Sequence, residues 1–166
     1  MMHHTLEKKR KLSFIDIKKI AYFTALSLIT AIVYKFIYII IANLFILKDP
    51  IPLNMMFESG YQISLSRYIS SILVAPIFET AIFIILIHVV TNKLNDSRLF
   101  FILCSSLLFG IYHFPTGGWF LTISTFLGGI IFAWSYHYFR NKLIKDHAAY
   151  AVILIHMLFN FVFLHL

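Results

Sequence analysis

Five long apolar runs, separated by short segments rich in lysine and arginine, constrain this 166-residue chain more than any other feature. The runs cover about residues 20–47, 68–90, 99–114, 119–139 and 148–166. A helix needs roughly 20 apolar residues to cross the hydrocarbon core of a bilayer, where its backbone satisfies its own hydrogen bonds. The pattern predicts an all-α, polytopic transmembrane helix bundle of about five spans over residues 20–166, preceded by a basic leader over residues 1–19.

The composition excludes several other classes of protein. Hydrophobic residues make up 60% of the chain and charged residues 13%, against about 45–50% and about 25% in soluble domains. A soluble globule of this size has too much surface to hide so many apolar side chains, and the single cysteine excludes a disulfide scaffold. The net charge is +7, and nearly all of the lysines and arginines lie outside the apolar runs. We therefore expect membrane lipid as a partner and no nucleic acid.

The distribution of positive charge predicts an orientation in the membrane. Eleven of the 14 lysines and arginines lie in the leader and in the segments after the second and fourth runs. Cytoplasmic segments are enriched in positive charge, so we expect a cytoplasmic leader and N-terminus, with the C-terminus outside. Lys35 is the one basic residue inside a run, and we expect its ammonium to extend toward an interface.

Besides Lys35, four polar side chains stand out in the apolar runs. Glu79 lies in the second run, His113 ends the third, and His156 and Asn160 lie four residues apart in the fifth. An ionisable group in hydrocarbon costs roughly 2.5–3.5 kcal/mol on insertion scales and usually faces a protein interior or a wet cavity. Residues four apart share a helix face. We therefore predict that the four side chains converge on a cavity within the bilayer, as an acid–base site.

The predicted depths of these groups do not match. At 1.5 Å per residue, His113 lies about 22 Å from the cytoplasmic end of its run, whereas His156 lies about 14 Å from the start of its own. The two histidines meet only if the third run is tilted or begins deeper in the membrane, so the sequence leaves open on which side the cavity opens.

Three motifs, in this order, resemble those of the CPBP family of intramembrane proteases, also called the CAAX-protease and bacteriocin-processing (Abi) family. The first is Ala75–Thr80, which is similar to the family's Ala-Pro-x-x-Glu-Glu stretch. The second is Ser105–His113, with Phe-x-x-x-His, and the third is His156–Asn160, with His-x-x-x-Asn. Gly128–Gly129 falls where the family has a glycine-rich helix, and we expect it to permit close helix approach. The resemblance covers residues 70–161.

The resemblance implies an intramembrane endopeptidase in a prokaryotic inner membrane, hydrolysing a membrane-associated peptide or protein. Residue by residue, it implies that Glu79 is the general base that activates water and that His113 holds or polarises that water. His156 and Asn160 match the pair that stabilises the oxyanion. These roles agree with general chemistry, because donors aimed at a developing oxyanion contribute strongly to acyl transfer.

Two departures from the family pattern leave other functions open. Thr80 replaces the second glutamate of the Glu-Glu-x-x-x-Arg motif, and Ile84 replaces its arginine. The glutamate and arginine of the family pattern can form an ion pair, and losing both leaves no unpaired charge. The two replacements also raise an alternative, in which the chain is a catalytically weak or inactive relative that acts as a bacteriocin-immunity or scaffold protein. A buried glutamate and histidines also suit a small proton-coupled transporter, although such folds usually contain internal repeats.

The sequence allows two views of metal dependence. Glu79, His113 and His156 form a two-histidine, one-carboxylate set of the kind that binds zinc. The chain has no H-E-x-x-H helix, and the resemblance to glutamate-based members favours water activation without a metal or other cofactor.

Overall fold

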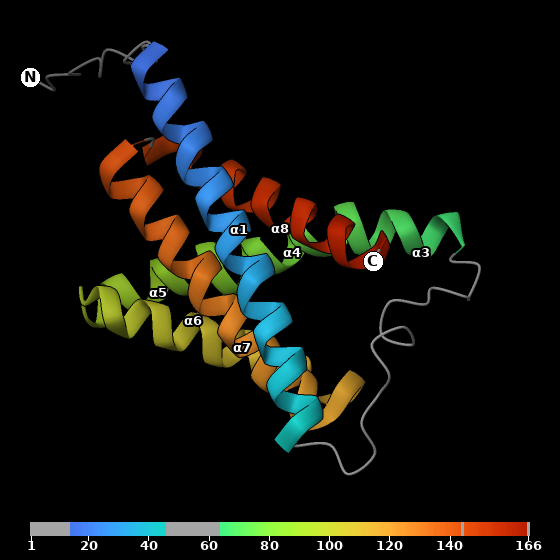
Figure 1. The fold of residues 1–166 in the computed structure, drawn as a ribbon. Coiled ribbons are helices and arrows are strands. Elements are labelled where there is room, and N and C mark those ends of the chain that lie inside the picture. The colour runs from blue at the N-terminus through green and yellow to red at the C-terminus, as the bar shows by residue number, and fades with distance from the viewer. Residues whose placement is uncertain (1–13, 46–63, 144, 166) are drawn as a thin grey trace, which may run out of the picture.

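The computed structural model describes residues 14–45, 64–143 and 145–165, and every regular element in them is a helix (Figure 1). Residues 1–13 of the predicted leader and residues 46–63 of the polar connection after the first run lie outside the described residues. The helices are α1 (Phe14–Phe45), α3 (Leu65–Ile69), α4 (Ala75–Glu79), α5 (Ile87–Leu94), α6 (Arg98–Tyr112), α7 (Phe114–Tyr138) and α8 (Ala148–His165). Short π or 3₁₀ turns connect some of them: η1 (Ser70–Val74), η2 (Thr80–Leu86), η3 (Phe139–Leu143) and η4 (Lys145–His147).

The predicted all-α membrane bundle is confirmed. Three continuous rods, over residues 16–44, 65–94 and 114–143, are long and apolar enough to cross a membrane. Two shorter apolar helices, over residues 98–112 and 148–164, complete the bundle. Many large apolar side chains face outward, including Phe78 at 62% and Leu44 at 69% exposed, as expected of a surface solvated by lipid.

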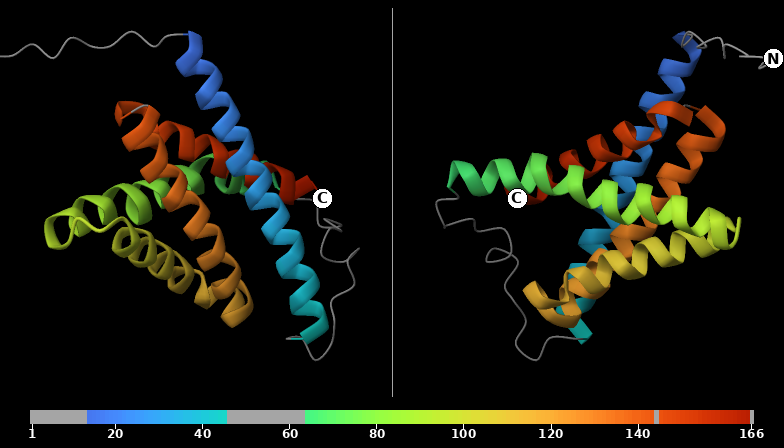
Figure 2. Two further views of the ribbon diagram at one scale, coloured as in Figure 1. Left: turned by 60° about the vertical axis from the view of Figure 1, so that its left-hand side comes forward. Right: turned by 180° about the vertical axis from the view of Figure 1, so that it is seen from behind.

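The rods cross one another rather than standing in parallel. α1 and α7 lie side by side, whereas α8 and the rod from α3 to α5 cross them at a steep angle (Figures 1 and 2). Hydrogen bonds join α1 to α7 at several levels: the Tyr34 hydroxyl donates to the Ser124 carbonyl (3.1 Å), the Tyr38 hydroxyl to the Phe120 carbonyl (2.7 Å), and the Ser135 hydroxyl to the Ser27 hydroxyl (3.0 Å).

The segment between the third and fourth runs, residues 115–118, contains a kink. Gly117 and Gly118 have non-helical backbone angles, and Gly118 takes a φ of +55°, which costs glycine little. The helix itself begins earlier than the predicted residue 119, at Phe114, because Pro115 is compatible with a first helical turn.

The rod from Leu65 to Leu94 changes its helical winding on both sides of Glu79. Pro76 has no N–H to donate to the preceding turn, and the π turn η1 precedes it. The second π turn, η2, begins at Thr80, directly after Glu79. Single π turns inside α-helices are frequent at functional sites, because they change the direction in which nearby side chains point.

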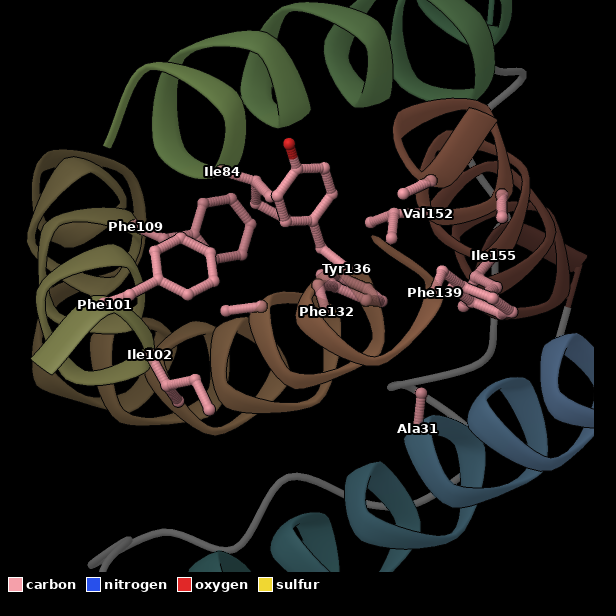
Figure 3. Packing of buried hydrophobic residues seen from close by; sticks show 13 residues of the cluster. Ala31, Ile84, Phe101, Ile102, Phe109, Phe132, Tyr136, Phe139, Val152 and Ile155 are labelled. Atoms are coloured by element: carbon pink, nitrogen blue, oxygen red, sulfur yellow. The ribbon is translucent and has the colours of Figure 1, made fainter. Parts of the chain in front are cut away.

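The apolar core lies between η2, α6, α7 and α8, with α1 on its outer side (Figure 3). Its largest fully buried side chains include Phe101, Phe139, Ile155 and Val152. Two glycines permit the close helix approach predicted for them. A Cβ on Gly129 would lie 3.0 Å from the Cα of Ser106 on α6, and a Cβ on Gly128 would lie 2.6 Å from the hydroxyl of Tyr34 on α1.

Candidate active site

Glu79 ends α4 and lies between two histidines from different helices. Its Oε1 is 3.6 Å from Nε2 of His113, at the junction of α6 and α7, and its Oε2 is 3.4 Å from Nε2 of His156 in α8. All three side chains are mostly buried, at 15%, 19% and 6% exposed. The carboxylate therefore faces an imidazole on each side within a largely enclosed space.

A backbone carbonyl determines which ring nitrogen of His113 carries a proton. Its Nδ1 lies 2.8 Å from the carbonyl oxygen of Phe109, and a carbonyl only accepts hydrogen bonds. Nδ1 must therefore carry the proton, so in a neutral imidazole Nε2 presents a lone pair toward the Glu79 carboxylate. Two acceptors facing each other need a hydrogen between them, supplied by a protonated partner or by water. The pair is built to hold a proton or a water molecule.

Phe109 does more than pack one turn below His113. Its ring lies edge-on to His113, with centroids 4.7 Å apart, and edge-on to His156 at 5.9 Å. Phe132 of α7 lies against the other side of His156, with ring centroids 4.5 Å apart. These rings hold the two imidazoles in place and keep the surroundings of Glu79 apolar.

Asn160 lies on the same cavity as the other three predicted residues. The cavity has a volume of about 330 Å³, and its wall includes Glu79, His113, His156 and Asn160. The Asn160 Nδ2 donates to the carbonyl of Ser71 in η1 at 2.9 Å. That bond anchors the amide and leaves its second N–H available. The structure thus brings all four predicted side chains to one cavity, and their chemical roles remain predictions.

A second, much smaller space lies behind Glu79. It measures about 10 Å³ and is lined by Glu79, Thr80 and His156 among others, which is about the minimum room for one water molecule. Thr80 is 1% exposed, and its hydroxyl has no hydrogen-bond partner among the described residues. A buried hydroxyl without a partner is costly, so a water in this space would satisfy Thr80 and touch the carboxylate.

The prediction for Lys35 is wrong. Instead of extending to an interface, its Nζ donates to the Ser124 hydroxyl at 2.7 Å, and the side chain lines the cavity of about 330 Å³. α1 crosses the bundle beside α7, which turns this face of α1 inward (Figure 1). Sequence reasoning missed Lys35 as a site residue, although a charge inside an apolar run is itself the signal.

The position where the family pattern has an arginine contributes no charge. Ile84 is 5% exposed and belongs to the apolar core (Figure 3). The cavity nevertheless contains a cation, because Lys35 enters it from α1. The cation at this cavity therefore comes from α1 and not from the rod that carries Glu79.

The structure removes the mismatch in predicted depth. The rods cross at steep angles (Figure 2), so a histidine at the end of α6 and one in the middle of α8 reach the same carboxylate. Within the part of the chain that the structure describes, no group of three or more His, Cys, Asp or Glu side chains is arranged to hold a metal ion.

Comparison with known proteins identifies the family. The model of a family described as type II CAAX prenyl endopeptidase Rce1-like matches residues 61–162, which contain all four candidate site residues. Comparisons with curated proteins and with solved structures gave no match. The match covers well over half of the 166 residues. The chain therefore belongs to the Rce1-like family of type II CAAX prenyl endopeptidases, and it is an integral membrane protein of the protease type.

Proposed function

We propose that this protein is an intramembrane endopeptidase that hydrolyses a peptide bond in a membrane-associated peptide or protein, with Glu79 as the base that activates water. The observation that carries the proposal is the contact of one buried carboxylate with two imidazoles, at 3.4 and 3.6 Å, on a cavity between membrane helices. A low-dielectric site strengthens such electrostatic interactions.

The proposed reaction begins with a water molecule beside Glu79. The carboxylate takes one proton from the water, whose oxygen attacks the carbonyl carbon of the scissile peptide bond. His113, with its Nδ1–H held by the Phe109 carbonyl, orients Nε2 toward the same water. The proton then passes to the leaving amine as the C–N bond breaks, and Glu79 returns to its starting state.

The negative charge of the tetrahedral intermediate needs donors. His156 and Asn160 lie on one face of α8, four residues apart, and both line the cavity. The Ser71 carbonyl holds the Asn160 amide in position, so its second N–H is a pre-oriented donor. Lys35 adds a positive charge to the same cavity, which favours negative charge on the reacting carbonyl oxygen.

The direct test is a comparison of cells that carry the wild-type protein with cells that carry Glu79→Gln. The substitution preserves shape and removes the base, so we expect one membrane-associated precursor to accumulate while the amount of inserted protein stays unchanged. Quantitative mass spectrometry of new peptide termini in membrane fractions provides the readout. Wild-type processing by Glu79→Gln would contradict the proposal. A cellular phenotype that persists in Glu79→Gln would instead favour the immunity or scaffold alternative, which Thr80 and Ile84 motivate.

The proposal includes hydrolysis without a metal. To measure cleavage, the first substrate to use is a prenylated peptide that ends in the CAAX motif, because the matched family is described as CAAX prenyl endopeptidases. If zinc held by Glu79, His113 and His156 takes part, prolonged treatment of the purified protein with a chelator will remove cleavage and added zinc will restore it. We expect chelation to leave the rate unchanged.

A further inference from the structure

A second polar cavity, of about 220 Å³, lies apart from the candidate active site. It forms where α5 ends, α6 begins and α7 gives way to η3 and η4. None of its lining residues belongs to the cavity around Glu79. The proposed peptidase chemistry therefore assigns it no role.

Positive charge dominates the wall of this cavity. Arg98 lines it from the start of α6, Arg140 and Lys145 line it from the connection between α7 and α8, and Asp96 is the one carboxylate among its lining residues. The Asp96 carboxylate forms no ion pair with any of the three cations. Three cations around one hollow repel each other unless an anion lies between them.

His88 adds a buried polar group to the same wall. It is 6% exposed and lies between the rings of Phe101 and Tyr136, with centroids 4.9 and 5.2 Å away. Its Nε2 is 3.3 Å from the amide nitrogen of Asn92 and so accepts a hydrogen bond. The neutral ring then carries its hydrogen on Nδ1, and this buried atom has no partner among the described residues. An acceptor within hydrogen-bond distance of Nδ1 would satisfy it.

The N-terminus of helix α6 also favours an anion in this cavity. Ser97, the N-cap residue of the 15-residue helix α6, lines the cavity. A helix N-terminus carries partial positive charge and free backbone N–H groups, which favour anions. Arginine side chains match the oxygen geometry of a phosphate with paired N–H donors, and basic pockets at the ends of membrane helices suit lipid phosphates.

We propose that this cavity, formed by Arg98, Arg140, Lys145 and His88, binds a phosphate group, carried either by an anionic lipid headgroup or by a soluble phosphate compound. Basic residues near membrane helix ends are common and by themselves only set orientation. Lys93 and Lys142 provide the comparison, because they lie in the same two connecting regions, are exposed as Arg98 and Lys145 are, and do not line the cavity.

The test compares two double variants with the same loss of charge. The full-length protein, the cavity variant (Arg140→Gln with Lys145→Gln) and the control variant (Lys93→Gln with Lys142→Gln) are placed in phosphatidylcholine nanodiscs. Their unfolding temperatures are measured with and without phosphatidylglycerol in the disc, and with inorganic phosphate or chloride at matched ionic strength. We expect the wild type and the control variant to be stabilised by a phosphate source, and the cavity variant to lose that shift.

The arms of the experiment also identify the source of the phosphate. Stabilisation by phosphatidylglycerol alone assigns a lipid headgroup, whereas stabilisation by inorganic phosphate in neutral discs assigns a soluble phosphate. Equal shifts in both double variants, or no shift in the wild type with either source, would overturn the proposal. If the cavity variant does not fold, Arg98→Gln is the second cavity variant, with Lys93→Gln as its single-site control. The readout does not depend on peptide cleavage.

Discussion

Glu79 and Thr80 are neighbours in sequence, but the polar groups around their side chains differ. The Glu79 carboxylate contacts two histidines, whereas the adjacent Thr80 hydroxyl is buried without a hydrogen-bond partner among the described residues. Both residues line the space that has room for about one water. We infer that Thr80 positions water against the carboxylate, at the place where the family pattern has a second acid.

Replacing Thr80 by valine tests this inference, because valine keeps the shape and removes the hydroxyl. A lost hydrogen bond to the water costs about 1 kcal/mol, so kcat should fall about fivefold. The unfolding temperature should change little, because valine fills the same space and only the hydrogen bond to the water is lost. Thr80→Ser, which retains the hydroxyl, is the matched control. A wild-type kcat for Thr80→Val would show that Thr80 only fills space.

Lys35 is a second residue whose effects on activity and on stability are expected to differ. Lys35→Met removes the ammonium from the cavity, and a charged hydrogen bond is worth about 1.5–3 kcal/mol, so we expect at least about a tenfold loss in kcat/KM. The fold should not weaken, because a charge in a membrane cavity is costly. Lys35→Arg should retain more activity, and the exposed Lys142→Met should retain all of it. Equal rates for Lys35→Met and Lys142→Met would contradict a role for Lys35.

The residue patterns predicted which polar groups share a cavity, but not which further residues join them. Glu79, His113, His156 and Asn160 are unusual inside apolar runs, so their burial was predictable from cost alone. Lys35 was not placed correctly, because a lysine near the middle of a long helix has two low-cost positions, an interface or a wet cavity. The packing of α1 against α7 decides between them, and no local pattern encodes it.

Among the secondary-structure elements, the contact of α6 with α7 supports the site most directly. Gly129 allows the backbone of α6 to approach at Ser106, one turn before Phe109, whose carbonyl binds His113. The helix boundaries follow from local signals: the Ser97 hydroxyl accepts from the Phe100 N–H to cap α6, and Gly117–Gly118 kinks α7. The π turns around Pro76 were not predictable, because they depend on how the rod packs.

Gly129→Ala should destabilise the protein more than Gly128→Ala. The new methyl group at 129 meets backbone at 3.0 Å, whereas at 128 it meets the end of the Tyr34 side chain at 2.6 Å, which can move. Overpacking costs typically about 1–3 kcal/mol when the neighbour cannot yield. Thermal unfolding of the two purified variants measures the difference. A larger loss in Gly128→Ala would mean that Tyr34 is held more firmly than the α6 backbone.

At the scale of the whole molecule, several basic segments gather at one end of the bundle. The loops after α5 and α7 line the same cavity, and the first half of α1 lies there too, with Phe23 against Tyr138 at 4.4 Å. Charge counting predicted that these segments share one side of the membrane. The steep crossing of the rods was not predictable, because hydropathy gives the length of a span and not its tilt.

The orientation itself can be measured with reporter fusions. With the N-terminus cytoplasmic and five crossings, a C-terminal reporter should be active only outside the cytoplasm. Alkaline phosphatase, active outside, and green fluorescent protein, fluorescent inside, give opposite signals when fused after Leu166. A fluorescent fusion with no phosphatase activity would require an even number of crossings and would contradict the predicted topology.

The central claim is that the Glu79 carboxylate activates water for peptide hydrolysis. Its most direct test is the cleavage rate of a membrane peptide by purified wild-type protein, Glu79→Gln and Asp16→Asn in nanodiscs, with unfolding temperature measured alongside. General base catalysis contributes about 10²–10⁴-fold, so Glu79→Gln should lose at least about 100-fold in rate while Asp16→Asn, in the first turn of α1, keeps the wild-type rate. A folded Glu79→Gln protein that cleaves at the wild-type rate would contradict the account.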